Sequence, residues 1–151
     1  MRRYRWVMTL AVLAGLTAGC ASTQQQPVEI RDAWVRPAAA GGETAGYFTI
    51  ENHTKAPVTL TGIQSDWGDA SMHQTVVENN GAMAKMMPVS SVEIPAVGQV
   101  TFTPGGYHVM IENLKGDLAP GEHVALSIRL EGGKSLSVTA VVQDQPGGHH
   151  H

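Results

Sequence analysis

Hydrophobic and polar residues alternate in several short stretches of this chain, and no stretch sustains the period of an amphipathic helix. The clearest alternations are Val58–Ile63, Val100–Phe102, Val124–Leu130 and Leu136–Val141. Turn-forming residues lie between the alternating segments at Gly41–Gly42, Asn79–Gly81, Pro104–Gly106, Pro120–Gly121 and Gly132–Gly133. Short strands separated by such turns predict an all-β sandwich or barrel with Greek-key connections.

The first twenty residues differ in composition from the rest of the chain. Arg2, Arg3 and Arg5 precede an apolar run, Val7–Leu16, which is too short for a bilayer span of about 20 residues. We therefore predict a removed lipoprotein signal peptide over 1–19, although Thr17 stands where a bacterial lipobox prefers leucine.

Four segments follow from this interpretation: the signal peptide 1–19, a tether 20–27 anchored to the membrane through lipidated Cys20, a folded domain 28–144 and a flexible tail 145–151. The protein is then expected in the periplasm. An ordinary secretory signal cut near Ala21, which would leave an unanchored periplasmic protein, is the alternative.

Charge and residue usage exclude several classes of function. After Cys20 there are seven Lys or Arg against thirteen Asp or Glu, which gives a net charge of −6 and argues against nucleic-acid binding. Cys20 is the only cysteine of the chain, so the predicted domain has neither a disulfide nor a thiolate ligand. We find no Ser-His-Asp or Cys-His arrangement and no Gly-rich phosphate loop, and we do not expect an enzyme.

Histidine and methionine form the most distinctive chemical pattern. His108 and Met110 are two residues apart, so on a strand both side chains point to one face. Further donors lie upstream in Met72–His73 and in the methionine-rich stretch Met83–Met87. Thioether sulfur together with imidazole nitrogen favours Cu(I) over hard cations such as Mg²⁺ or Ca²⁺. The pattern predicts a soft-metal site.

Strand parity limits which of the upstream residues can share that site. If 71–77 pairs with 82–89 across the Asn79–Gly81 turn, His73 lies opposite the Met86–Met87 end of its partner. Met86 then faces one side, whereas Met83 and Met87 face the other unless a bulge intervenes. Met72 and His73 likewise face opposite sides, so one belongs to the core and the other to the site. Whether Met86, Met83, Met87 or Met72 binds metal stays open at this point.

The remaining histidines and the aromatic residues have simpler interpretations. His53 and His123 lie beside predicted turns and are expected to be solvated surface groups. Trp34 and Tyr47–Phe48 are expected to be core residues. The terminal His149–His151 are a shortened purification tag, a disordered end, or a second, looser site for Cu(II), an ion that clustered imidazoles suit.

Several segments are similar to one known family, the periplasmic PCu(A)C copper chaperones. They are Ala33–Arg36, Ala45–Ile50 with Asn52, Pro104–Met110 and the loop Leu114–Gly121. The family pattern is His, ten residues, Met, twenty-one residues, then His-x-Met. Met86 and His108 are separated by twenty-one residues and Met110 completes the ending, whereas twelve residues separate His73 from Met86. The hairpin tip can absorb two extra residues without changing the face that His73 presents. Choosing Met72 and Met83 as the first two ligands would give the family's gap of ten residues, but the gap from Met83 to His108 would then be wrong.

The resemblance implies a cupredoxin-like β-sandwich that binds one Cu(I) through His73, Met86, His108 and Met110. It also implies delivery of copper to the CuA-containing subunit of cytochrome c oxidase, alongside Sco-type proteins. Two alternatives use the same residues: a periplasmic copper or silver buffer without a dedicated client, and a structural lipoprotein whose methionines belong only to the core.

Overall fold

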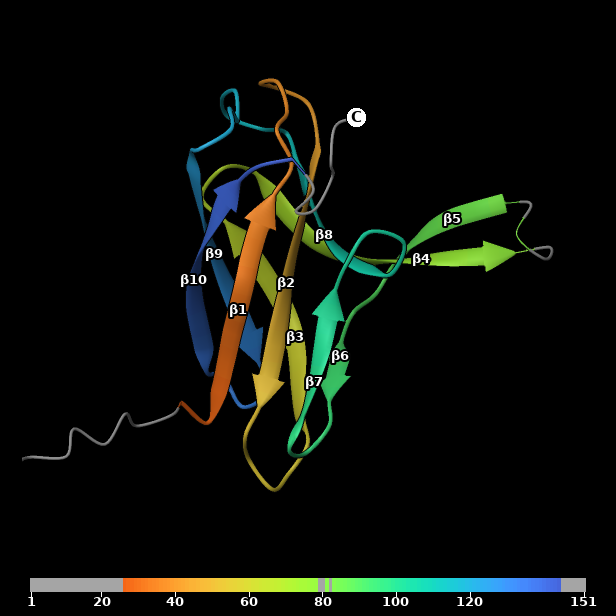
Figure 1. Cartoon of the computed structure of the whole chain (residues 1–151), viewed down its shortest axis with the longest axis vertical. Coiled ribbons are helices and arrows are strands. Elements are labelled where there is room, and N and C mark those ends of the chain that lie inside the picture. Colours follow the sequence, from red (N-terminus) through yellow and green to blue (C-terminus); the bar gives the residue numbers. More distant parts are fainter. Residues whose placement is uncertain (1–25, 79–80, 82, 145–151) are drawn as a thin grey trace, which may run out of the picture.

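The computed structural model describes residues 26–78, 81 and 83–144, and the elements formed by these residues are ten β-strands (Figure 1). The strands are β1 (Val28–Val35), β2 (Thr44–Asn52), β3 (Val58–Ser65), β4 (Asp69–Glu78), β5 (Met83–Pro88), β6 (Val92–Ile94), β7 (Gly98–Phe102), β8 (Tyr107–Glu112), β9 (His123–Leu130) and β10 (Ser135–Val142). Among the described residues, no helix has the length and apolarity needed to span a bilayer. The predicted signal peptide, residues 20–25 of the predicted tether and the tail 145–151 lie outside this part of the chain.

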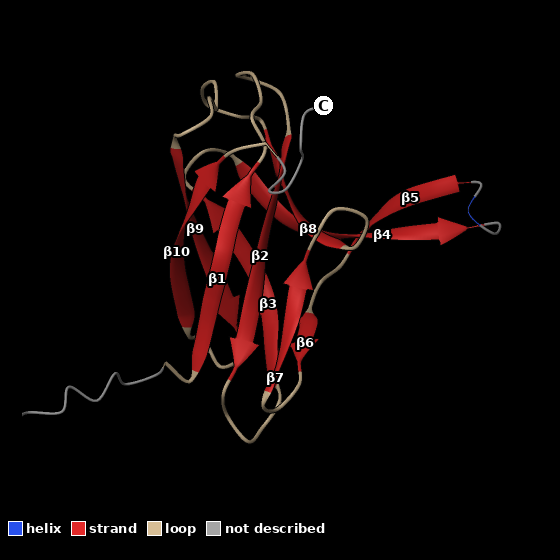
Figure 2. Ribbon diagram, viewed as in Figure 1, coloured by secondary structure: helices blue, strands red, loops and turns tan. Residues whose placement is uncertain are grey.

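The strands form one rolled sheet in the order β5-β4-β8-β2-β1-β10-β9-β3-β6, with β7 paired to β2. Only β1 and β10 run parallel, and the remaining pairs are antiparallel. Most neighbours in this order are not consecutive in sequence, as Greek-key connections require. The strands pack as two layers, and the β4–β5 hairpin extends away from the body of the sandwich (Figure 2). The all-β sandwich prediction is confirmed.

The core lies between the layers and is formed by the buried apolar residues of the strands other than β5. Phe48 of β2 and Phe102 of β7 stack with their ring centroids 4.4 Å apart, and both are almost fully buried. Trp34 and Tyr47 are also buried, but they pack against each other with ring centroids 4.5 Å apart and lie outside the core cluster, so the core prediction is confirmed for Phe48 and only the burial is confirmed for the other two. The short strand β6 was not expected from the sequence, because three residues are too few to show an alternation.

The predicted turns occur where expected. Glycines with positive φ lie in the segments singled out above: Gly41, Gly81, Gly105, Gly121, Gly132 and Gly133. Of the Asn79–Gly81 turn, Asn79 and Asn80 lie outside the described residues. The flanking strands β4 and β5 agree with the predicted pairing segments to within two residues at each end.

Strand β4 has two different partners along its length. Its residues 69–74 pair with β8, and its residues 73–78 pair with β5. His73 and Gln74 therefore have strands on both sides, and this is where the hairpin leaves the sandwich (Figure 1). Because only β4 joins the two ladders, its register fixes how the residues of β5 meet those of β8.

Gly68 helps to set that register. It precedes β4, and a Cβ atom at this position would overlap the backbone carbonyl oxygen of Glu112 at the end of β8. A second contact supports the same junction, since the Asn113 amide donates to the Asp69 carboxylate at 2.8 Å. The start of β4 is thus held against the end of β8 by a close backbone approach that only glycine permits.

Replacing Gly68 with alanine should therefore destabilise the protein. We expect Gly68→Ala to lower the free energy of unfolding by about 1–3 kcal/mol, the usual range for forced overpacking, as measured by urea denaturation. Gly62→Ala is the matched control, because the nearest atom to its added Cβ is 3.9 Å away, on Arg129. Equal effects of the two substitutions would show that the close approach to Glu112 does not set the register.

Candidate metal centre

The pairing of β4 with β8 brings two histidines together. His73 lies directly opposite His108, and Ser71 lies opposite Met110. The imidazole centroids are 5.8 Å apart with their planes tilted by 33°. Opposed residues of an antiparallel pair point to the same face. His73, His108 and Met110 therefore share one face of the sheet.

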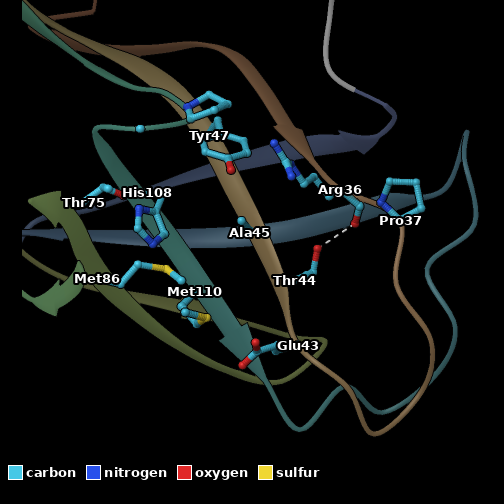
Figure 3. Close-up of a pocket in the computed structure, with 12 residues that line it drawn as sticks. Arg36, Pro37, Glu43, Thr44, Ala45, Tyr47, Thr75, Met86, His108 and Met110 are labelled. Atoms are coloured by element: carbon cyan, nitrogen blue, oxygen red, sulfur yellow. Dashed lines mark hydrogen bonds between the residues drawn. The ribbon is translucent and has the colours of Figure 1, made fainter. Parts of the chain in front are cut away.

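The pairing of β4 with β5 adds Met86 to that face. Met86 lies opposite Thr75, which is two residues beyond His73 and so points the same way. His73 itself lies opposite Pro88, one position past the predicted Met86–Met87 end. In Figure 3 the Met86 thioether lies beside Met110 and the His108 ring. All four residues expected at the site thus face the same side.

The other methionines point elsewhere. Met72 is 5% exposed and belongs to the core cluster, as expected for the neighbour of an outward-facing His73. Met87 lies opposite Gln74 and Met83 opposite Glu78, which places both on the reverse face of the hairpin. No register shift interrupts this pairing among the described residues. The predicted parity is confirmed, and it separates Met86 from Met83 and Met87.

The His108 ring is oriented by a backbone carbonyl. Its Nδ1 lies 3.2 Å from the carbonyl oxygen of Gly106, which also accepts a hydrogen bond from the backbone N–H of Thr75 at 3.0 Å. A carbonyl can only accept, so this contact assigns the proton of the neutral ring to Nδ1 and the lone pair to Nε2. That Nε2 is buried and has no hydrogen-bond partner among the described residues. Sequence reasoning did not identify the Gly106 carbonyl, although its place two residues before His108 puts it within reach.

The His73 ring is oriented by a side chain on its own strand. Its Nε2 lies 3.0 Å from the Ser71 hydroxyl, while its Nδ1 is buried and has no partner in the described part of the chain. Buried polar atoms are nearly always hydrogen-bonded, because leaving one without a partner costs about 1–3 kcal/mol. Two such nitrogens on facing rings fit a site that an ion completes. Ser71 was missed in the sequence, where only its position two residues before His73 hints at this contact.

The four proposed ligands differ in burial, from His108 as the most buried to Met86 as the most exposed. His108 is 4% exposed, whereas Met86 on the edge strand is 58% exposed. The described residues of β5 are all exposed, and Pro88 and Lys85 on it are residues that discourage pairing with another strand. A cavity of about 340 Å³ opens over Met86, His108 and Met110 and continues toward Arg36 and Tyr47 (Figure 3). The site is therefore fixed at its base and open at one side.

A second histidine cluster lies elsewhere on the sandwich. His53 Nε2 is 3.4 Å from the Glu51 carboxylate and 3.6 Å from that of Glu29. Arg31 already engages both carboxylates, at 3.1 Å from Glu29 and 3.3 Å from Glu51, and the hydrogen bond that its guanidinium donates to Glu29 raises the pKa of Arg31. The group is an ion-pair network between β1 and β2. His53 is a surface residue, as expected, but its side chain is 29% exposed and also lies against carboxylates, which the sequence did not reveal. His123 is exposed, as expected.

Comparison with known proteins finds a matching family and a sequence relative. Residues 28–142 match the LpqE-like lipoprotein family. Lxx21020 of Leifsonia xyli subsp. xyli (strain CTCB07), a protein named as a lipoprotein, is 31% identical over 159 residues, covering 98% of this chain and 94% of that protein.

Two solved structures extend the comparison. The Cu(I) form of DR1885 from Deinococcus radiodurans is 32% identical with a TM-score of 0.61, over 87% of this chain and 88% of that one. The copper-bound PCuAC domain of PmoF2 has a TM-score of 0.62 at 19% identity, over 80% and 95% of the two chains, and shows the fold. The predicted cupredoxin-like sandwich and the resemblance to PCu(A)C proteins are confirmed.

The ring geometry yields a prediction for the metal-free protein. We expect neutral His108 to be the Nδ1–H tautomer, because the Gly106 carbonyl requires a proton on that nitrogen. Long-range ¹H–¹⁵N correlation spectra of the imidazoles distinguish the two tautomers, with exposed His123 as the internal reference. Observation of His108 as the Nε2–H form would mean that its Nε2 is not available to an ion.

Proposed function

Since the chain belongs to the LpqE-like lipoprotein family of PCu(A)C domains, we propose that it binds a single Cu(I) ion through His73, Met86, His108 and Met110 and acts as a copper chaperone. The observation that carries the proposal is the pair of buried imidazole nitrogens, on His73 and His108, for which the described residues provide no hydrogen-bond partner. They lie on the same face as two thioethers. Two nitrogen and two sulfur donors form a set that suits monovalent copper.

The donor set also indicates what the ion does. The four side chains are neutral when they bind, so a Cu(I) complex would have a net charge of +1. Blue-copper electron-transfer sites need a cysteine thiolate, and the sequence has a single cysteine, Cys20, so none is present among the described residues. Without a thiolate the site favours Cu(I) over Cu(II) and is suited to holding the ion in one oxidation state. Copper is the cargo of such a site.

The difference in burial between the ligands supports release to a partner. His108 and its Gly106 contact would keep the base of the site in place, while Met86 on the exposed strand β5 can leave the ion with little rearrangement. A receiving protein that offers thiolates would compete well against neutral ligands. We propose that the recipient is the CuA-containing subunit of cytochrome c oxidase and that Sco-type proteins take part in the same delivery.

The proposed location is the periplasmic face of a membrane. Cys20 follows small residues and is the expected point of lipid attachment, and the segment 21–27 would be the tether. A lipoprotein name on the relative Lxx21020 supports this proposal. Anchoring would place the copper site near a membrane-bound recipient and raise its effective concentration there.

The ligand assignment is tested by paired substitutions. His108→Ala, Met110→Ala and Met86→Leu should each weaken Cu(I) binding by about tenfold to a hundredfold or more, as measured by competition with a chromophoric chelator. Met83→Leu and Met87→Leu are the matched controls, because both residues belong to β5 but face the reverse side. Deleting His149–His151 should also leave Cu(I) affinity unchanged. Loss of binding in Met83→Leu but not in Met86→Leu would contradict the assignment.

The chaperone role is tested against a simple buffer role. Copper should pass from the loaded protein to an apo CuA domain faster than it dissociates into solution, because Met86 can yield to an incoming ligand before the other three release. Stopped-flow transfer rates that rise with the concentration of the acceptor would show direct transfer. Rates that equal passive release at every acceptor concentration would favour a copper or silver buffer without a dedicated client.

A further inference from the structure

The cavity over the proposed copper site continues well beyond the four ligands. Its lining includes Met86, His108 and Met110 at one part and Arg36, Tyr47 and Glu43 at others (Figure 3). Its volume of about 340 Å³ is within the range of small-molecule sites. Arg36 is not a ligand in the proposed copper site, so its position in this cavity needs a different explanation.

Sheet register fixes where Arg36 lies relative to the ligands. The backbone N–H of Arg36 donates to the Ala45 carbonyl at 3.0 Å, and Ala45 in turn pairs with Met110. Arg36 and Met110 are thus two strand spacings apart, about 10 Å between backbones. An arginine side chain spans much of that distance. The guanidinium can therefore approach a molecule that is bound to the copper.

The guanidinium is positioned but is not neutralised by an ion pair. Its carbon lies 5.8 Å from the centroid of the Tyr47 ring, and the backbone carbonyl of Arg36 accepts a hydrogen bond from the Thr44 hydroxyl at 2.7 Å. The ion pairs of the described residues involve Arg31 and His53 and do not include Arg36. Glu43, also at the cavity, lies beside Met110 (Figure 3). A cation with unused donors beside a soft-metal site is suited to an anionic ligand.

We propose that this cavity is the route of copper exchange and that it takes a small organic thiolate that also bears a carboxylate. The inference rests on the proposed Cu(I) site. The carboxylate binds the Arg36 guanidinium while the sulfur reaches the copper. The thiol releases its proton to solvent, a bond forms between its sulfur and Cu(I), and the bond between Cu(I) and the Met86 thioether breaks. Copper remains monovalent throughout, so the step needs no oxidant or reductant.

Two arguments select this class of ligand over others. A thiolate is softer and more strongly donating than a thioether, so it can replace the exposed Met86. The protein is acidic overall, so an anion approaching at random would be repelled, and a local cation at the opening restores attraction. Arg36 therefore supplies selectivity for a carboxylate, while the copper supplies selectivity for sulfur.

The test compares two thiols of nearly the same shape on the Cu(I)-loaded protein. One is 3-mercaptopropionate, and the other is its neutral amide, 3-mercaptopropionamide. Exchange is followed by stopped-flow absorbance of the thiolate–Cu(I) charge-transfer band under anaerobic conditions. Arg36→Gln should slow exchange with the carboxylate by about threefold to tenfold and leave the amide nearly unchanged. Added salt should slow the exchange of the wild-type protein with 3-mercaptopropionate until its rate approaches that of Arg36→Gln.

Matched variants separate this effect from general changes in charge. Arg129→Gln removes the same charge from a different groove, near Gly62 and Asp69, and should have no effect on exchange. Glu43→Gln removes a negative charge at the cavity and should not slow the carboxylate. Arg36→Lys should keep most of the attraction, and Arg36→Met, which removes the charge but keeps the apolar stem, serves as the test variant if Arg36→Gln fails to fold.

Each outcome bears on the inference. Equal slowing of both thiols by Arg36→Gln, no slowing of either, or the same result with Arg129→Gln would overturn it. If the protein loads Cu(I) normally but shows no discrimination at Arg36, only this inference fails. If the wild-type protein takes up no Cu(I), the proposed function fails and this inference fails with it.

Discussion

The cross-strand pairing of His73 with His108 is the constraint on which the candidate site depends. It brings the two imidazole rings to 5.8 Å from each other, tilted by 33°, and makes Ser71 and Met110 the next pair on the same face. A slip of one residue would turn His73 into the core and expose Met72 in its place. The close approach of Gly68 to Glu112 fixes the strands at one end, and burial of Met72 opposes the slip energetically.

The same pairing determines how the methionines divide. Strand β4 continues past the sandwich to pair with β5, so the face occupied by His73 extends into the hairpin and reaches Met86. The site is therefore assembled from a buried part, on β4 and β8, and an exposed part, on β5. A buried base preserves geometry, and an exposed edge permits exchange. The two properties that a carrier of Cu(I) needs are thus located on different strands.

Much of this arrangement could be predicted from the sequence. Alternating residues located the long strands, glycines located the turns, and parity alone separated Met86 from Met83. What could not be predicted depends on contacts between segments distant in sequence. The hydrogen bond from Thr75 to the Gly106 carbonyl requires knowing that β8 lies against β4, and the contact of His53 with Glu29 requires the pairing of β1 with β2. Arg36 reaches the site only through two successive strand pairings, which no local pattern reveals.

X-ray absorption at the copper edge of the Cu(I)-loaded protein tests the central claim most directly, because sulfur and nitrogen neighbours of the ion are counted separately. The account predicts one copper per chain with two thioether sulfurs and two imidazole nitrogens, and the loss of one sulfur in Met86→Leu. A shell of nitrogen and oxygen alone, or a sulfur count that Met86→Leu does not change, would contradict it.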